Sequence, residues 1–369
     1  MRLPELKNGH KMNKYLSDKL RIISFISIIM VVFIHTNNTI VKFNSGSMYL
    51  CSKYNIFVQT FFSQEITKIA VPIFFCISGY LFFLKLNGTI DEFILKYRKR
   101  VKSLLLPYLI WSIWGLLFYI ILQLFPQGKN FFTNELIANY SLTKIIETIF
   151  LYPITYQFWF VRDLMVLVIF SPIFYWLIKY FRAIPILLLF IIWLGFFNFS
   201  FVIIRNESIL FFCLGAYFAM NNSDFILKKL NKKGYWIFAF LWFIILSINT
   251  TLICAKSDQT VLFLLLDKIG TLIGIIAIWS TYDIVMRNKT NPNKTIYNLS
   301  LFTFFIYAFH EPLLKIIKKG IFYISGASST MSMINFFMAP IIAIIISVIV
   351  GNFIKKNAPG FYSLITGGR

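Results

Sequence analysis

The sequence predicts an all-α, polytopic integral membrane protein with about ten transmembrane helices and both termini in the cytoplasm. Hydrophobic residues make up 58% of the 369 residues and aromatic residues 19%. A soluble domain would expose much of that apolar surface to water, whereas the core of a bilayer is itself apolar. Charged residues account for only 14% and fall in short clusters between long apolar runs. The distribution of lysine and arginine among these clusters predicts how the helices are oriented.

Ten apolar segments are candidates for crossing the bilayer, which requires ~20 mostly apolar residues. The sixth candidate is shorter than the others. The ten segments divide the chain into a basic N-terminal arm (residues 1–19), a transmembrane domain (20–356) and a C-terminal tail (357–369). The expected spans are Leu20–Thr39, Ile66–Leu86, Ser103–Leu124, Leu164–Phe181, Ile184–Phe201, Ile209–Met220, Tyr235–Cys254, Thr260–Ile284, Leu299–Ile317 and Met331–Ile354.

The basic residues favour one side of the membrane. Alternation through ten spans places the richer clusters together with both termini, which the positive-inside rule assigns to the cytoplasm. This topology accounts for the net charge of +22, so we expect no nucleic-acid partner and take membrane lipid as the first partner. The clusters on the richer side are the Lys7–Arg21 arm, Lys96–Lys102, Lys179 with Arg182, Lys228–Lys233, Arg287, Lys289, Lys294, Lys355 and Lys356.

The longest outer connections are expected at Ile40–Glu65 and Phe125–Arg162. Connections of this length are often lids or binding loops. The four cysteines show no metal-ligand spacing, so we expect no metal site.

Polar residues within apolar helices are the most informative, because a charge at bilayer depth costs at least ~2.5 kcal/mol on insertion scales. His35 lies near the outer end of the first expected span, after a run of seven apolar residues. An imidazole can accept a proton from a hydroxyl near neutral pH, so His35 is a candidate general base. The alternative is a structural residue at a helix interface.

His310 and Glu311 lie inside the ninth expected span, directly before Pro312. Proline lacks a backbone N–H and leaves a carbonyl one turn earlier without its partner, so we expect a kink beside this pair. His310 and Glu311 either line a substrate site or hold this helix to a neighbour.

Two further motifs each have a structural and a functional interpretation. Trp159, Arg162 and Asp163 open the fourth span and form either an interfacial anchor or part of a substrate site. Ser78 and Tyr80 flank Gly79 in the second span, where small residues allow close helix approach, and they either serve this packing or line the acceptor site.

The basic cluster Lys96–Lys102 precedes Pro107 and is explained mainly by topology and anionic lipid. It also suits a phosphorylated cytosolic donor, because the guanidinium groups of Arg98 and Arg100 can bind phosphate oxygens in a fork.

Taken together, these motifs resemble acyltransferase family 3, whose members are integral membrane O-acyltransferases, and in particular its enterobacterial-common-antigen O-acetyltransferase branch. The resemblance extends from about Leu16 to Arg369. Thirteen residues separate Arg21 from His35, three more than the family pattern has, and Ser24 stands where that pattern has arginine. The motifs, in order, are Ser17–Arg21 leading to His35, Pro72–Leu81, Leu106–Tyr108, Trp159–Leu164, Tyr307–Leu313 and Leu364–Arg369.

The resemblance implies a membrane O-acetyltransferase in the bacterial inner (plasma) membrane. It implies acetyl-CoA as co-substrate, no bound cofactor, and a hydroxyl of a surface polysaccharide or of its lipid-linked precursor as acceptor. Arg21, Arg98 and Arg100 are then the candidates to hold the donor's phosphates. His35 would activate the acceptor hydroxyl or carry the acyl group itself, and the sequence leaves both routes open.

Two other classes of protein share part of this pattern. A transporter or flippase for a polar glycan or small molecule also needs polar groups in its helices, but we see no repeated half and no matched pair of broken helices. A non-catalytic membrane scaffold would leave His35 without a role.

Overall fold

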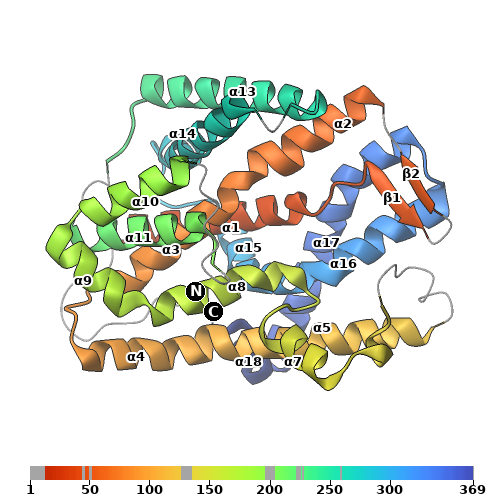
Figure 1. The fold of residues 1–369 in the computed structure, drawn as a ribbon, viewed down its shortest axis with the longest axis horizontal. Helices are drawn as coiled ribbons and strands as arrows, with labels where there is room; N and C mark the ends of the chain where they lie inside the picture. The colour runs from red at the N-terminus through yellow and green to blue at the C-terminus, as the bar shows by residue number, and fades with distance from the viewer. Residues whose placement is uncertain are drawn as a thin grey trace. The chain divides into compact units, whose positions relative to one another are not determined.

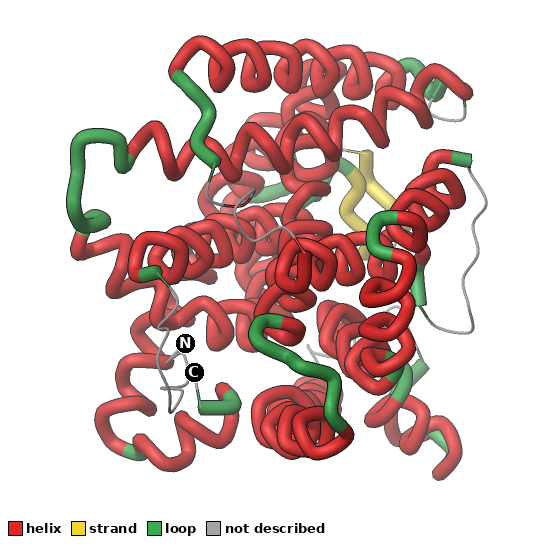
Figure 2. Tube along the Cα trace, turned by 90° about the vertical axis from the view of Figure 1, so that its left-hand side faces the viewer, coloured by secondary structure: helices red, strands yellow, loops and turns green. Residues whose placement is uncertain are grey.

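The computed structural model describes residues 13–43, 46–49, 52–125, 135–195, 204–221, 226, 228–257 and 260–368. The described chain is helical apart from one antiparallel hairpin, in which β1 (Ile40–Phe43) pairs with β2 (Gly46–Tyr49). Figure 2 shows the hairpin in yellow among the helices in red. The chain forms two compact units. Unit 1 comprises Met1–Val31, Gln64–Arg100 and Asp163–Thr303, and unit 2 comprises Val32–Ser63, Val101–Arg162 and Phe304–Arg369.

Six helical segments in the described residues are long and apolar enough to cross a membrane, and a seventh qualifies if one bent pair counts as a single span. A multi-pass helical membrane protein is therefore confirmed, whereas the count of ten and the position of the termini stay predictions. The six segments are Lys53–Phe83, Ile90–Leu124, Lys232–Cys254, Val261–Val285, Lys294–Ser325 and Ser329–Asn357.

The other four expected spans are shorter, bent or more polar in the structure. Every 18-residue stretch of α1 (Lys14–Ile34) contains Asp18, Lys19 and Arg21. The fourth expected span forms the bent pair, in which Tyr156–Ile169 and Ser171–Phe181 meet at 60°. Pro172 explains the break, because proline cannot donate the hydrogen bond that would continue the helix. The fifth and sixth correspond to α10 (Ile184–Leu194) and α11 (Asn206–Asn221), and the rest of the fifth (196–201) lies outside the described residues.

Unit 1 contains most of α1, and residues 1–12 of the predicted basic arm lie outside the described residues. The element order can be followed by colour in Figure 1. The other helices of unit 1 are α3 (Ala70–Phe83), α4 (Ile90–Arg100), most of α8 (Trp159–Ile169), α9 (Ser171–Phe181), α10, α11, α13 (Lys232–Cys254), α14 (Val261–Val285) and α15 (Lys294–Leu299). Unit 1 also contains short 3-10 turns at Thr67–Ile69 and Ser300–Phe302.

Two pairs of helices pack extensively against each other in unit 1. Helix α3 lies against α11, and α13 lies against α14. A Cβ atom on Gly79 would lie 2.0 Å from the carbonyl oxygen of Phe212, and one on Gly215 would lie 2.0 Å from that of Cys76. The expected close approach at Gly79 is therefore present, and small residues on both helices make it possible.

The helices of unit 2 are α2 (Lys53–Thr60), α5 (Leu106–Leu124), α7 (Leu142–Phe150), α16 (Thr303–Ser325), α17 (Ser329–Asn357) and α18 (Pro359–Thr366). Unit 2 also has a π-helical turn at Val101–Leu105 and 3-10 turns at Ile137–Asn139 and Tyr156–Phe158. A second π-helical turn, Phe61–Ile66, begins in unit 2 and continues into unit 1. The predicted C-terminal tail forms α18, which packs on α5 and α17. Trp111 Nε1 donates to the carbonyl of Ile365 at 2.9 Å, which joins α5 to α18.

The two outer connections are more helical than expected. Helix α2 lies inside the first of them and continues through a π-helical turn toward α3, so that the second candidate span begins at Lys53 instead of Ile66. Helix α7 lies inside the second. The 8-residue α2 buries the polar side chains of Asn55, Gln59 and Thr60, and buried polar residues hide a helix from a search for apolar runs.

Candidate functional site

The candidate site lies within unit 2, where His35 directly follows the C-terminal end of α1. The last carbonyls of a helix have no partner within it. Lys318 of α16 supplies one here, because its Nζ donates to the carbonyl of His35 at 2.7 Å and to that of Asn37 at 3.3 Å. Asn335 of α17 in turn donates to the carbonyl of Lys318 at 2.9 Å. The backbone of His35 is thereby fixed to α16.

The ring of His35 contacts two other rings. It stacks on His310 with centroids 5.6 Å apart and planes 12° from parallel. It also meets the ring of Tyr156 edge-on, at 4.8 Å and 83°. The N–H groups of an imidazole lie in the plane of its ring, so the two stacked histidines do not hydrogen-bond to each other. His35 is half-buried as a residue, and its ring nitrogens make no hydrogen bond with another described residue.

His310 is fully buried, and its hydrogen bonds identify the tautomer. Its Nδ1 lies 2.8 Å from the carbonyl oxygen of Tyr307 and 3.1 Å from that of Ile306. Carbonyl oxygens only accept, so we assign the proton to Nδ1, which leaves the lone pair on Nε2. Nε2 makes no hydrogen bond with any described residue.

The predicted kink lies at Glu311, the one non-helical residue within α16 (φ −109°, ψ 130°). Pro312 withholds the hydrogen bond that the carbonyl of Ala308 would otherwise accept. Gln157 is buried beside this turn, and its Nε2 lies 3.4 Å from the carbonyl oxygens of both Ala308 and Glu311. Tyr307 donates its hydroxyl to the carbonyl of Gln157 at 2.7 Å. The expected kink is confirmed, and the Gln157 segment is held against it.

The Glu311 carboxylate is buried, with 1% of the residue exposed, and accepts no hydrogen bond from a described residue. Lys315, one turn further along α16, places Nζ 3.9 Å from Oε2 of Glu311. The same ammonium lies 4.8 Å from the centroid of the Tyr156 ring and 3.4 Å from the hydroxyl of Tyr119. A charge partner and two tyrosines therefore lie next to the paired histidines.

A buried polar network supports the segment after His35. Gln59 of α2 accepts from the backbone N–H of Asn38 at 2.9 Å and donates to its side chain at 2.9 Å. Ser332 of α17 donates to the same side chain at 2.6 Å, and Asn55 donates to Ser332 at 2.9 Å. Buried hydrogen-bond networks rigidify their surroundings, so this one fixes the chain between α1 and β1.

The contacts described for the tryptophan motif are with neighbouring segments of the chain. Arg162 donates to the carbonyl of Leu151 at 2.7 Å and lies 5.8 Å from the ring of Tyr152, which anchors the turn after α7. Trp159 is half-buried and its ring meets Phe160 edge-on at 6.4 Å. Asp163 is fully buried and belongs to unit 1. Their anchoring or acceptor-binding role stays a prediction.

The residues expected at the donor all belong to unit 1. Arg21 of α1 lies 4.7 Å from the ring of Tyr297. Arg98 is exposed on α4, and the half-buried Arg100 lies 5.7 Å from the ring of Phe82. Lys96 donates to the carbonyls of Phe82 and Leu84 at the end of α3. Arg98 and Arg100 therefore lie in one short basic segment, while Arg21 comes from another helix.

Ser78 and Tyr80 lie on α3, in unit 1, on either side of the contact with α11. Tyr80 is buried and Ser78 is half-buried. The backbone nitrogen of Tyr80 would lie 2.7 Å from a Cβ atom on Gly215 of α11, which places Tyr80 in the helix contact, and a role of either residue at the acceptor stays a prediction.

Comparison with known proteins gives the site its context. The family model described as an acyltransferase domain, that of acyltransferase family 3, matches residues 19–352. The chain belongs to acyltransferase family 3. It is also 26% identical over 370 residues to a protein of Rhizobium meliloti (strain 1021) named succinoglycan biosynthesis protein ExoH, in a match that covers 97% of this chain and 94% of that protein. No solved structure matches.

Membership of acyltransferase family 3 makes the protein an acyltransferase enzyme and a multi-pass membrane protein. Among the described residues, no group of three or more His, Cys, Asp or Glu side chains is arranged to hold a metal ion. The side chains described together in unit 2 carry imidazole, carboxylate, ammonium and phenol groups.

The sequence did not point to Lys315, Lys318, Tyr119, Tyr156 or Gln157. Lys315 and Lys318 follow Glu311 by four and seven positions, which places all three on one face of a helix. That spacing was the available signal. Tyr156 and Gln157 lie in a short 3-10 turn of an expected loop, where no periodicity marks a residue as buried.

Proposed function

We propose that this acyltransferase transfers an acetyl group from cytosolic acetyl-CoA to a hydroxyl of a surface polysaccharide or of its lipid-linked precursor. The proposal places the protein in the bacterial inner membrane, with ten spans and both termini cytoplasmic. Membership of acyltransferase family 3 supports the reaction class. The relative ExoH is named a succinoglycan biosynthesis protein, and this similarity supports a saccharide acceptor.

The observation that carries the proposal is the stacked pair of histidines. His35 is held through its backbone by Lys318 while its half-buried ring stays available beside Tyr156. General acid–base catalysis requires an imidazole that is positioned in this way within reach of the substrate. The same lysine also satisfies carbonyls at the end of α1, so the contact that bears on catalysis is the placement of the His35 ring against His310 and Tyr156.

The chemistry breaks the C–S bond of the thioester and forms a C–O bond. In one route, a ring nitrogen of His35 takes the proton from the acceptor hydroxyl as the oxygen attacks the acetyl carbonyl, and that proton later neutralises the CoA thiolate. In the other route, the imidazole attacks first, CoA leaves, and the acceptor then takes the acetyl group from His35. Both routes end with the ester, free CoA and a regenerated histidine.

The donor's phosphates are assigned to Arg98 and Arg100, with Arg21 as a third candidate. A guanidinium group binds phosphate oxygens through paired hydrogen bonds, so each arginine can hold one phosphate. This assignment predicts a higher KM for acetyl-CoA in an Arg98→Gln and Arg100→Gln double variant, with a smaller effect on kcat.

The test uses purified protein in proteoliposomes with acetyl-CoA labelled in the acetyl group. Transfer of label to an added glycan or lipid-linked sugar, lost in His35→Ala, is the expected result. The proposal would be contradicted if the label stays on CoA with every acceptor tested, and to the same extent for the wild type and for the variant. Ping-pong kinetics and label bound to the protein without acceptor would identify the acyl-histidine route, whereas a requirement for both substrates together would identify the general-base route.

A further inference from the structure

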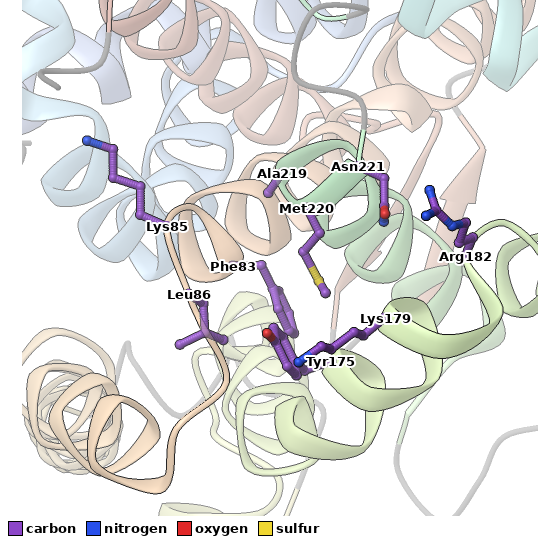
Figure 3. Close-up of a pocket in the computed structure, with 9 residues that line it drawn as sticks. All are labelled: Phe83, Lys85, Leu86, Tyr175, Lys179, Arg182, Ala219, Met220 and Asn221. Atoms are coloured by element: carbon purple, nitrogen blue, oxygen red, sulfur yellow. The ribbon is translucent and has the colours of Figure 1, made fainter.

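A hollow of about 430 Å³ lies in unit 1, at the ends of α3, α9 and α11. It is distinct from the histidine site, all of whose residues belong to unit 2. Figure 3 shows its apolar and polar lining side chains together. The apolar residues are Phe83, Leu86, Ala219 and Met220, and the polar ones are Lys85, Tyr175, Lys179, Arg182 and Asn221.

The wall formed by α9 is fixed in place. Tyr175 is buried and donates its hydroxyl to the carbonyl of Asn87 at 2.6 Å. A Cβ atom on Gly88 would lie 2.1 Å from the Tyr175 ring, and the positive φ of Gly88 (+90°) is one that glycine adopts readily. The turn after α3 therefore packs closely on α9, so this wall of the hollow is preformed.

Two cations of the polar rim, Lys179 and Arg182, have no counter-ion among the described residues. Lys179 lies over the rings of Trp176 and Tyr175, at 4.7 and 5.6 Å, and its only described interactions are with these rings. The guanidinium of Arg182 makes no hydrogen bond or ion pair with a described residue. In Figure 3, Arg182 lies near Asn221, whereas the ammonium of Lys85 points away from the other polar groups. Lys179 and Arg182 are thus the cations that a ligand in the hollow can reach.

The backbone at Arg182 is strained. Its φ of 52° and ψ of −112° at the end of α9 place it in a region that residues other than glycine rarely adopt. Such strained conformations cluster at ligand clamps. Lys85 also has a positive φ, 57°, at the end of α3. Two non-glycine residues with positive φ therefore border the same hollow.

Cations near helix C-termini are stabilised by the helix dipole, which accounts for the position of Lys179 and Arg182. The dipole alone does not require a hollow with an apolar floor between those cations. On the expected orientation, this end of unit 1 faces the cytoplasm, where basic pockets between membrane helices bind anionic head groups. We infer that the hollow binds a phosphate group on a partly apolar ligand, held by Lys179, Arg182 and Asn221 over the Phe83–Met220 floor.

The phosphate can come from an anionic phospholipid or from the CoA moiety of the donor, and the two sources are measured separately. The variant is Lys179→Gln with Arg182→Gln. Its control is Arg287→Gln with Lys289→Gln, which removes two exposed cations of unit 1 that do not line the hollow. Native mass spectrometry counts phosphatidylglycerol retained from nanodiscs that contain equal phosphatidylcholine. Thermophoresis measures coenzyme A binding in neutral detergent.

Loss of two contacts is expected to lower the affinity for one of the two ligands by about tenfold or more relative to the control. Selective loss of phosphatidylglycerol identifies a lipid site, and selective loss of coenzyme A identifies a donor site. Ala219→Phe keeps every charge, fills the hollow and is expected to reproduce that loss. The inference is overturned if both ligands bind the variant as they bind wild type, or if the control loses as much as the variant. The inference rests on the topology and the donor of the proposed function, but neither readout requires acetyl transfer, so failure of the inference is distinguishable from failure of that function.

Discussion

The imidazole rings of His35 and His310 lie stacked, with centroids 5.6 Å apart and planes 12° from parallel, although 275 positions separate them in the chain. Each ring is held differently. His35 is fixed through its backbone by Lys318, and His310 through the bond from its own Nδ1 to the carbonyl of Tyr307. The lone pair assigned to Nε2 of His310 and the ring nitrogens of His35 are thereby left for chemistry.

Replacing His310 with alanine is expected to lower kcat at least tenfold while KM for acetyl-CoA changes by less than about twofold. The His35 ring loses its stacked neighbour, and a misoriented base forfeits part of the ~10²–10⁴-fold effect of general base catalysis. Initial rates in proteoliposomes give both constants. Tyr323→Ala, on the 84% exposed Tyr323 of the same helix, is the control. Equal rates in wild type and His310→Ala would reduce His310 to a packing residue.

Replacing Lys318 with methionine removes the hydrogen bonds to the carbonyls of His35 and Asn37. Both carbonyls are partly buried and lose their donor, and His35 is no longer tied to α16. We expect a lower melting temperature and a larger loss in kcat than in binding. Lys318→Arg, which can still donate, is expected to recover part of both. Lys356→Met, which replaces an exposed lysine of α17, serves as the control. If it changes the melting temperature and kcat as much as Lys318→Met does, Lys318 has no specific role in holding His35.

Unit 1 contains a buried ion pair that is expected to contribute strongly to its stability. Lys19 Nζ lies 2.8 Å from Asp283, both side chains are 2% exposed, and Tyr15 donates to the same carboxylate at 2.6 Å. Removing one partner leaves a buried charge, which costs about 3–5 kcal/mol. Lys19→Met and Asp283→Asn are each expected to lower the melting temperature in detergent by several degrees, and the double variant by less than their sum. Additive effects would show that the pair is not coupled.

The contact between α3 and α11 leaves no room for a side chain at Gly79. A Cβ atom there would lie 2.0 Å from the Phe212 carbonyl oxygen, whereas one on Gly320 would have nothing within 4 Å. Alanine gains about 0.5–1 kcal/mol of helix propensity over glycine at either position. Gly79→Ala is therefore expected to lower the melting temperature, and Gly320→Ala to leave it unchanged or raise it. The same response at both positions would mean that the close approach is absent.

The sequence was sufficient to single out the polar candidates within the apolar helices but not the residues that surround them. A polar side chain within an apolar run can be recognised from the sequence alone, which is why the sequence singles out His35, His310 and Glu311. Proline acts on its own helix, so the kink before Pro312 was predictable. The stacking of His35 on His310 depends on how separate helices pack, and a single sequence contains no signal for that.

Lys315 and Lys318 were missed for a different reason. The predicted ninth span ends at Ile317, just after Lys315 and before Lys318, whereas α16 continues to Ser325. Helix α2 was also not predicted, because its amide side chains Asn55 and Gln59, which are buried in the structure, are polar residues typical of a loop. Apolar periodicity locates helices that face lipid, and it fails where a helix buries polar groups against its own protein.

The central claim, that His35 carries out acetyl transfer to a surface glycan, is tested most directly by the mass of that glycan. It is measured in cells with the intact gene, a deletion, and His35→Ala at matched expression. We expect an increment of ~42 Da, the mass of one acetyl group, with the intact gene alone. Loss of the glycan from the surface on deletion, without a change in its acylation, would favour a transporter. A glycan that keeps its acetyl groups in His35→Ala would contradict the assignment of His35.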